Sequence, residues 1–173
     1  MSTETAQWTV DNWSRRQLIT YNCQLSSLYH RKRERFFALC DKLTASAALI
    51  ASTAALSEYL PTAEYKAMAG AVVAAVTLPG IVFGWSDRAR AHALLAARFV
   101  ALESEVVAAG AMNSAQLDIA EAKGISIGAD EPPQLSALTR LCQNELGNAK
   151  GIPTKTLPFW ERWLAHFLDL PKA

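Results

Sequence analysis

Two long stretches without a charged residue, Leu43–Ser57 and Ala67–Ser86, dominate the hydrophobic pattern of this chain. Helices of soluble proteins keep a polar face opposite their apolar stripe, but the first stretch offers only Ser and Thr for such a face. The second stretch matches the roughly 20 apolar residues that a helix needs to cross a bilayer core. The pattern therefore predicts an all-α membrane protein with a hairpin of two transmembrane helices, over residues 39–60 and 66–86.

The first third of the chain is predicted to form one helix. No Gly or Pro interrupts it before Pro61, so a helix can run from about Ser14 through the first uncharged stretch. Asn12 is a candidate N-cap, and residues 1–13 form a polar lead-in. Pro61 is expected to end the helix, because proline cannot continue the pattern of backbone hydrogen bonds.

A second long helix is expected to begin at about Thr62 and to end at Gly110, a residue type favoured at helix C-termini. Pro79–Gly80 should kink it, because proline removes one backbone hydrogen bond. Residues 14–110 thus form a helical hairpin with long cytoplasmic extensions, and residues 111–173 form a small helical tail.

The tail begins with a short predicted helix. Asn113 or Ser114 can cap its N-terminus, because both side chains accept hydrogen bonds from free backbone N–H groups. The helix should end at Gly124. Residues 125–133 are expected to be extended or loop, and Ile125–Ile127 carries the only strand signal in the sequence.

Two further helices are expected to complete the tail. Pro132 and Pro133 can open the first of them, which should close at Gly151. The last helix starts near Pro158. One of its faces is apolar and includes the aromatic residues Trp160, Trp163 and Phe167. Such a face can lie in the headgroup layer of a membrane, or it can dock onto the cytoplasmic helices or a neighbouring subunit.

Both uncharged stretches carry alanine at every fourth position. The first ridge is formed by Ala47, Ala51 and Ala55, and the second by Ala67, Ala71 and Ala75. Small residues at this spacing let helix backbones approach closely in lipid. The two ridges are therefore candidate helix-packing surfaces.

Basic residues lie mostly at one end of the predicted hairpin, and the connector near Thr62–Tyr65 is followed by a single lysine, Lys66. By the positive-inside rule, both termini are cytoplasmic and the connector lies outside. Aromatic residues near the ends of the two stretches are expected to mark the membrane–water boundary. The candidate anchors are Arg31, Lys32, Arg33, Arg35, Tyr59, Tyr65, Trp85 and Arg88.

A soluble alternative is an alanine-rich hairpin buried inside a helical bundle. Alanine ridges occur in such bundles too. However, a chain of 173 residues has little polar helix with which to surround two helices that are apolar on all sides. The membrane interpretation is therefore preferred.

Candidate chemistry is sparse. The formal net charge of +1 does not indicate nucleic-acid binding. Cys23, Cys40 and Cys142 are an odd number without a CxxC pair, which is typical of packed, reduced thiols. No catalytic or nucleotide-binding motif is present, so we expect no enzyme activity, no cofactor and no metal site.

The remaining polar residues leave alternatives open. His30 and His92 flank the two predicted membrane helices and could approach each other, but they are more typical of two interfacial polar residues. Glu131, Asn144 and Glu145 could form a small acidic cluster. Alternatively, Asn144 caps or cross-links the backbone where the tail folds back on the long helices.

The stretch Tyr29–Phe36, "YHRKRERF", the two uncharged stretches and the helix opening "SDRARAHALLAARFVALESEV" at Ser86–Val106 together resemble the SLATT group of bacterial proteins. The similarity covers roughly residues 14–110, and Ala129–Gly151 also looks like the tail of small SLATT-type proteins of bacteria and prophages. It implies a bacterial inner-membrane effector of conflict and phage-defence systems that forms pores. No sensing domain is fused here, so the trigger would be a separate sensor protein.

These observations lead to two functional hypotheses. The first is a homo-oligomer in contact with membrane lipids that perturbs or permeabilises the inner membrane, because two helices alone cannot enclose a pore. Its lining would come from Ser46, Thr53 and Thr77, with Glu58 and Glu64 at the outer mouth. The second is a membrane adaptor that does not conduct ions, such as a prophage superinfection-exclusion protein.

Overall fold

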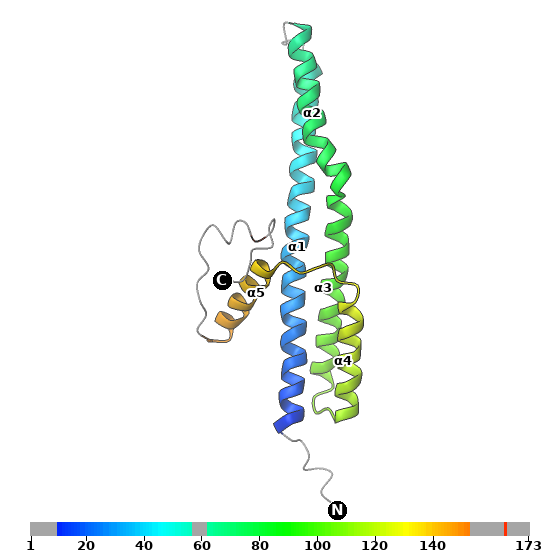
Figure 1. Cartoon of the computed structure of the whole chain (residues 1–173), viewed down its shortest axis with the longest axis vertical. Helices are drawn as coiled ribbons and strands as arrows, with labels where there is room; N and C mark the ends of the chain where they lie inside the picture. The colour runs from blue at the N-terminus through cyan, green and yellow to red at the C-terminus, as the bar shows by residue number, and fades with distance from the viewer. Residues whose placement is uncertain (1–9, 57–61, 153–164, 166–173) are drawn as a thin grey trace, which may run out of the picture. The chain divides into compact units, whose positions relative to one another are not determined.

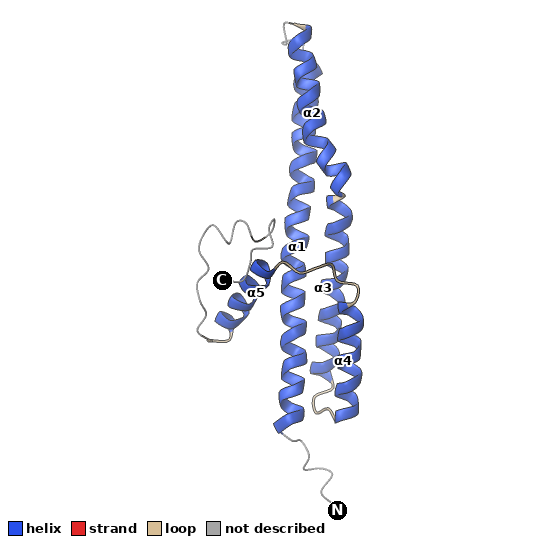
Figure 2. Ribbon diagram, in the orientation of Figure 1, coloured by secondary structure: helices blue, strands red, loops and turns tan. Residues whose placement is uncertain are grey.

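The computed structural model describes residues 10–56, 62–152 and 165, and all of its regular elements are helices (Figures 1 and 2). The all-α class is thus confirmed, and the described residues include no strand. The five helices are α1 (Val10–Leu56), α2 (Ala63–Phe83), α3 (Trp85–Ala108), α4 (Ser114–Gly128) and α5 (Ser136–Ala149).

The chain divides into two compact units. The first unit combines Met1–Lys32 with Ala93–Ala173, and the second is Arg33–His92. The boundaries between the units, after Lys32 and after His92, fall inside α1 and α3. The predicted division into hairpin and tail at residue 110 stays a prediction.

The core of the first unit lies among α1, α3 and α4, and α3 and α4 run side by side in opposite directions (Figure 1). Its side chains are mostly aliphatic, and Phe99 and Cys23 lie among them. Leu117 is fully buried. The core residues are Ile19, Cys23, Leu95, Phe99, Leu102, Val106, Met112, Leu117, Ala120 and Ile127.

A second cluster holds α5 against α1 within the same unit. Tyr29 of α1 packs with Leu138 and Cys142 of α5, and Ala165 is buried among them. The hydroxyl of Tyr29 also accepts a hydrogen bond from the backbone N–H of Leu135, at 3.0 Å. Ala165 therefore belongs to the α1–α5 contact.

The second unit contains the end of α1, all of α2 and the start of α3. In it α1 and α2 lie side by side (Figure 1). The helices approach closely where Thr44 meets Gly80: a Cβ atom added to Gly80 would lie 2.9 Å from Cγ2 of Thr44. Gly80 is therefore required by close helix packing, and not only as a neighbour of Pro79.

The sequence did not predict the interruption of the second long helix at Gly84, and the kink expected at Pro79–Gly80 stays a prediction. Pro79 lies inside α2, and the chain leaves the helix only at Gly84. Gly84 has a φ of 56°, in the left-handed region, and its N–H donates to the carbonyl of Gly80. Glycine adopts this conformation without a steric penalty, so it can end α2 and let α3 start at Trp85.

The tail also differs from the expectation at Ile125–Ile127, which is helical and not extended. α4 continues past Gly124 to Gly128 because Ile127 is buried on the same face as Leu117 and Ala120. Residues spaced by three and seven positions share one side of a helix, so the core requires helix here. Pro132 and Pro133 lie before α5 and outside it, since α5 begins at Ser136.

The helix ends confirm some of the predicted caps. Asn113 and Gln116 form a capping box at the start of α4. Gly110 and Gly151, with φ of 62° and 72°, follow α3 and α5. Asn12 is not an N-cap, because α1 already begins at Val10. Pro61, Pro158 and most of the polar lead-in lie outside the described residues.

Candidate membrane-interface site

The second unit exposes an apolar surface that is unusual for a protein in water. One helix among the described residues, within Ala63–Ala108, is long and apolar enough to cross a membrane, and none of its most apolar window is buried in the chain. The side chains of Ile81 and Val82 are 77 % and 74 % exposed. Large exposed apolar residues of this unit are Leu39, Leu43, Leu49, Ile50, Met68, Val72, Leu78, Ile81, Val82 and Phe83.

This surface needs an apolar partner. Burying a Val, Leu, Ile or Phe side chain fully is worth about 1.5–3 kcal/mol relative to leaving it in water. Large apolar side chains exposed together on one part of a protein are typical of membrane or protein contacts. The first predicted span, residues 39–60, includes residues outside the described part, so the two-span hairpin stays a prediction.

An aromatic and basic cluster lies at the end of this apolar surface. It consists of Phe37 from α1 and Trp85, Arg88 and His92 from α3, with Arg33 one helical turn before Phe37; we call it the interface cluster. The ring of Phe37 is 3 % exposed. It stacks on Trp85, with ring centroids 5.8 Å apart, and on His92 at 5.5 Å.

Two guanidinium groups approach the same ring. The central carbon of Arg33 lies 4.4 Å from the centroid of Phe37, and that of Arg88 lies 6.0 Å away. A cation within about 6 Å of an aromatic centroid is attracted by the π electrons of the ring. Phe37 therefore holds two positive charges at the end of the hairpin.

The spacing of the residues along their helices explains how the cluster forms. Arg33 and Phe37 are four positions apart on α1, and Arg88 and His92 are four apart on α3, so each pair shares one helix face. The left-handed turn at Gly84 starts α3 at Trp85. Trp85 also stacks on Phe83, at 5.0 Å between centroids, across this turn.

Such an arrangement is suited to a membrane–water boundary. Tryptophan combines an apolar ring with one polar N–H group and is enriched at that depth. Arginine can place its aliphatic stem beside apolar groups while its charge reaches the headgroups. The predicted anchors Arg33, Trp85 and Arg88 are thus brought together by the fold.

The other predicted anchors are not part of this cluster. Arg31 and Arg35 are exposed on α1, and Tyr65 is exposed near the start of α2. Lys32 belongs to the first unit, where its ammonium forms an ion pair with Glu145 at 2.6 Å. Tyr59 lies outside the described residues.

The two alanine ridges have different surroundings. Ala47 is half-buried on α1, and the side chains of Ala51 and Ala55 lie outside the described part of the structure. The second ridge, formed by Ala67, Ala71 and Ala75, is exposed. It therefore does not supply the contacts of α2 within one chain. The half-buried positions of α2 are Ala69, Val73, Val76, Thr77, Pro79 and Gly80.

Two of the candidate pore-lining hydroxyl groups, those of Thr53 and Thr77, donate hydrogen bonds to backbone carbonyls of their own helices. Thr53 donates to the carbonyl of Ile50 at 2.7 Å, and Thr77 donates to that of Val73 at 2.9 Å. Ser46 is exposed on α1 and Glu64 is exposed in the first turn of α2. Glu58 lies outside the described residues, as do Trp160, Trp163 and Phe167 of the tail.

A buried polar pair in the first unit was missed by sequence reasoning. The ring of His30 is fully buried, and its Nε2 lies 3.4 Å from Oε1 of Glu131, whose side chain is 9 % exposed. His30 also stacks on Phe99 at 6.0 Å between centroids. No short-range motif links residues so far apart, so only the fold reveals the pair.

The acidic residues singled out from the sequence are divided among different partners. Glu131 contacts His30, and Glu145 pairs with Lys32. Asn144 is half-buried on α5. His92 belongs to the interface cluster of the second unit and His30 to the first unit. Among the described residues, no three His, Cys, Asp or Glu side chains are grouped as metal ligands would be.

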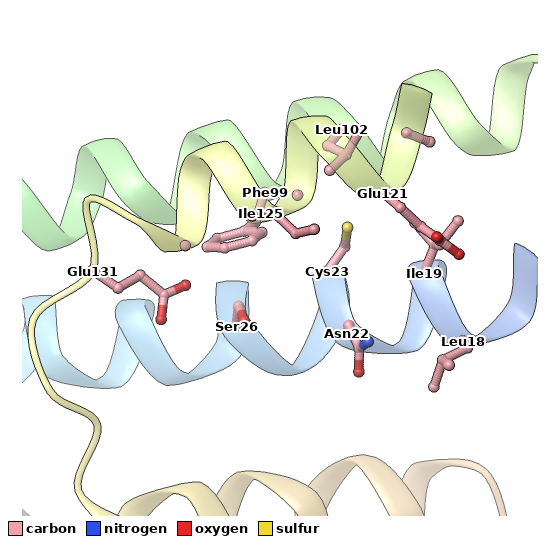
Figure 3. A pocket seen from close by; sticks show the side chains of 13 residues that line it. Leu18, Ile19, Asn22, Cys23, Ser26, Phe99, Leu102, Glu121, Ile125 and Glu131 are labelled. Atoms are coloured by element: carbon pink, nitrogen blue, oxygen red, sulfur yellow. The ribbon is translucent and has the colours of Figure 1, made fainter. Parts of the chain in front are cut away.

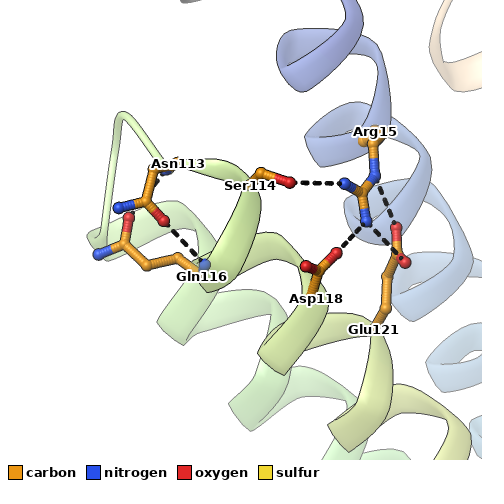
Figure 4. A network of polar contacts seen from close by, with 6 residues as sticks. All are labelled: Arg15, Asn113, Ser114, Gln116, Asp118 and Glu121. Carbon is orange, nitrogen blue, oxygen red and sulfur yellow. Dashed lines mark hydrogen bonds and ion pairs between the residues drawn. The ribbon is translucent and has the colours of Figure 1, made fainter. Parts of the chain in front are cut away.

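Arg15 joins α1 to α4 in the first unit (Figure 4). Its guanidinium donates to Asp118 at 2.7 Å and to both carboxylate oxygens of Glu121, at 3.2 and 2.9 Å. These hydrogen bonds, those to Glu121 most of all, raise the pKa of Arg15 above its ordinary value. Beside them, the capping box of Asn113 and Gln116 fixes the start of α4.

The two cysteines of the first unit are packed thiols, as predicted. Burial raises the pKa of Cys23 to about 11 and that of Cys142 to about 12. Both thiols are therefore protonated at neutral pH, and only a thiolate is a good nucleophile or metal ligand. The two side chains serve packing.

Comparisons with known proteins give no relative for this chain: no family model matches it, and neither a curated protein nor a solved structure is significantly similar. Function is therefore inferred from the residues and their arrangement.

Proposed function

We propose that this chain is an oligomeric protein of the bacterial inner membrane, in which the second unit crosses the bilayer as a two-helix hairpin. The observation that carries the proposal is the exposure of α2. Its apolar window has no residue buried in the chain, although water is a poor solvent for such a surface. Lipid and neighbouring copies of the chain would cover it.

The interface cluster supports the proposed orientation. It places Arg33 and Arg88 on one ring at the end of the hairpin where basic residues are most frequent. Under the positive-inside rule this end is cytoplasmic. Both termini of the chain are then cytoplasmic, and the connector between α1 and α2 lies on the outer side.

Within this architecture, we propose an effector that perturbs or permeabilises the membrane after a signal from a separate partner protein. The resemblance to the SLATT group supports this role. A path for ions needs several copies, because one hairpin cannot surround a lumen. The hydroxyls of Ser46, Thr53 and Thr77 would supply the polar groups along such a path, and Glu58 and Glu64 would favour cations at its mouth.

A second candidate is an adaptor that does not conduct. The hydroxyls of Thr53 and Thr77 donate to carbonyls of their own helices, which leaves the hairpin with little polar surface for water or ions. An adaptor would use its helical first unit for contacts and its hairpin as an anchor only.

Expression in cells loaded with a membrane-potential dye separates the two candidates. The wild type would be compared with Glu58→Gln plus Glu64→Gln at matched membrane levels, with any protein encoded beside it present. Loss of potential with the wild type, and less cation entry with the double variant, supports the effector. An intact potential in all samples removes the pore and leaves the adaptor.

A further inference from the structure

Three aromatic rings connect the exposed apolar surface of α2 with the guanidinium group of Arg88. Phe83, the last residue of α2, is exposed and stacks on Trp85 with ring centroids 5.0 Å apart. Trp85 stacks in turn on Phe37, at 5.8 Å, and the guanidinium carbon of Arg88 lies 6.0 Å from the centroid of Phe37. Apolar surface and positive charge are therefore continuous within the second unit.

The charge of Arg88 is directed to the surroundings of the protein. The residue is exposed, and the adjacent carboxylate of Asp87 pairs with Arg90 at 2.6 Å. Within the part of the chain that the structure describes, no carboxylate forms an ion pair with Arg88. A guanidinium group presents its N–H donors in a planar fork that matches the oxygens of a phosphate. Arg88 is therefore suited to bind a phosphate group.

Trp85 places a second donor near this guanidinium group. It lies three positions before Arg88 on α3, so the two side chains share one face of the helix, and both contact the ring of Phe37. Its indole N–H can donate one hydrogen bond, and tryptophan is enriched at the depth of the lipid headgroups. A phosphate beside Phe37 would thus meet one charged and one neutral donor.

The exposed face of α2 supplies the apolar half of the site. Leu78, Ile81 and Val82 follow each other at spacings of three and one, so they share one side of the helix, and all three are exposed. A molecule that fits both halves carries a phosphate group at one end and apolar chains at the other. Phospholipids have this composition.

An apolar hollow in the first unit offers a contrast. It measures about 390 Å³ and lies among α1, α3 and α4 (Figure 3). Glu121 and Glu131 line it, and among the described residues that form its walls none is Lys, Arg or His. A phosphate would find no cationic partner in these walls. An anionic lipid is therefore expected at Arg88 and not in this hollow.

We propose that Arg88 and Trp85 bind the phosphate of an anionic phospholipid, with an acyl chain along the exposed face of α2; this inference rests on the proposed membrane role. A zwitterionic lipid would bring its ammonium group close to the guanidinium group. Like charges repel, and the adjacent carboxylate of Asp87 already pairs with Arg90. The site therefore prefers a lipid of net negative charge.

Native mass spectrometry of the full chain in a mild non-ionic detergent tests this lipid site. Phosphatidylglycerol and phosphatidylethanolamine with identical dioleoyl chains are titrated, and the Kd of the first lipid bound per chain is measured. Phosphatidylglycerol should bind about fivefold more tightly, which is the contribution of one basic residue beside anionic lipid. Glycerol 3-phosphate at equal concentration should not displace it, because it lacks acyl chains. Equal Kd values, or displacement by glycerol 3-phosphate, would overturn the proposal.

Three variants locate the effect. Arg88→Gln should abolish the preference for phosphatidylglycerol. Arg35→Gln removes the same charge from an exposed position of α1, two residues before Phe37 and therefore on another side of that helix, and should keep the preference. Equal losses in both variants would show that only net charge matters. Gly124→Leu, at the hollow of the first unit, should also keep it, and a loss there would place the lipid in the hollow instead.

Carbonate extraction of cell membranes separates this proposal from the proposed membrane role. The wild type and Arg88→Gln should remain in the membrane pellet at equal levels, because one exposed side chain does not decide insertion. Recovery of the wild type in the soluble fraction would remove the membrane role and the lipid site together. A wild type that stays in the pellet but shows no lipid preference would remove the lipid site alone.

Discussion

Arg33 lies directly over the ring of Phe37, with its guanidinium carbon 4.4 Å from the ring centroid. Phe37 is 3 % exposed and also stacks on two side chains of α3, so its ring is the common contact of the interface cluster. Phe37 therefore connects the apolar part of the hairpin with Arg33 and Arg88 at its basic end.

Phe37→Ala should therefore destabilise the hairpin strongly. Truncating a buried phenylalanine typically costs about 3–5 kcal/mol, and this change also removes the surface on which Arg33 rests. Unfolding by increasing SDS in mixed micelles measures the loss. Leu39→Ala is the matched control, because Leu39 is 55 % exposed and should change stability by well under half as much. Equal losses would show that the ring contacts contribute little.

The orientation of the hairpin gives a second prediction. A reporter enzyme that is active only outside the cytoplasm should be active when inserted at Thr62–Tyr65 and inactive at either terminus. The reason is the concentration of Lys and Arg at the other end of the hairpin. Fractionation of the untagged protein is the control, and its recovery in the soluble fraction would remove the membrane assignment.

Close packing within the hairpin is tested at Gly80. Gly80→Ala would place a Cβ atom 2.9 Å from Cγ2 of Thr44, and Thr44 has little freedom because its side chain is branched at Cβ. Overpacking of this kind costs about 1–3 kcal/mol. Gly70→Ala is the control, since nothing lies within 4 Å of its added Cβ. In SDS unfolding, Gly80→Ala should be clearly less stable than Gly70→Ala.

The exposed ridge of α2 is expected to mediate contact between chains. Ala71→Leu should weaken the oligomer because a large side chain separates helix backbones that small residues bring together, while the fold of one chain stays intact. Val73→Leu, at a half-buried position of the same helix, is the comparison. Cross-linking in native membranes reports the assembly, and identical ladders for both variants would exclude this ridge as an interface.

Because burial raises the pKa of the thiols, we expect the folded protein to lose stability at alkaline pH. Cys142 has its pKa raised by burial from 9.0 to about 12, so above pH 9 the unfolded chain loses a proton that the folded chain keeps. Folding stability should then fall as the pH rises between these values. Urea unfolding at pH 8 and pH 10 measures the change, and Cys142→Ala should reduce its slope. A steeper fall of stability with pH in Cys142→Ala than in the wild type would contradict this prediction.

Sequence reasoning predicted the helical class because the chain has no Gly or Pro before Pro61 and carries two long uncharged stretches. It also located the caps at Asn113, Gly110 and Gly151, where local backbone chemistry decides. It missed Gly84 as the helix break, because proline is the stronger local signal. It also assigned Ile125–Ile127 to loop or strand, because the local sequence does not show that Ile127 is buried in the core.

The candidate sites show the same division. Arg33, Trp85 and Arg88 were predicted as anchors from charge and aromatic position, but their common partner Phe37 could not be, since Trp85 and Arg88 reach it from a different helix. The pair of His30 and Glu131 depends on tertiary packing of distant segments and has no local signal.

The left-handed turn at Gly84 limits which mutations the gene tolerates at this position. Every single-base change in a glycine codon that replaces glycine by another amino acid introduces a side chain with a Cβ atom. At a φ of 56°, such a residue costs about 1–2 kcal/mol in most cases. Random mutagenesis followed by selection for the folded protein should thus leave the glycine at position 84 almost unchanged while exposed alanines vary.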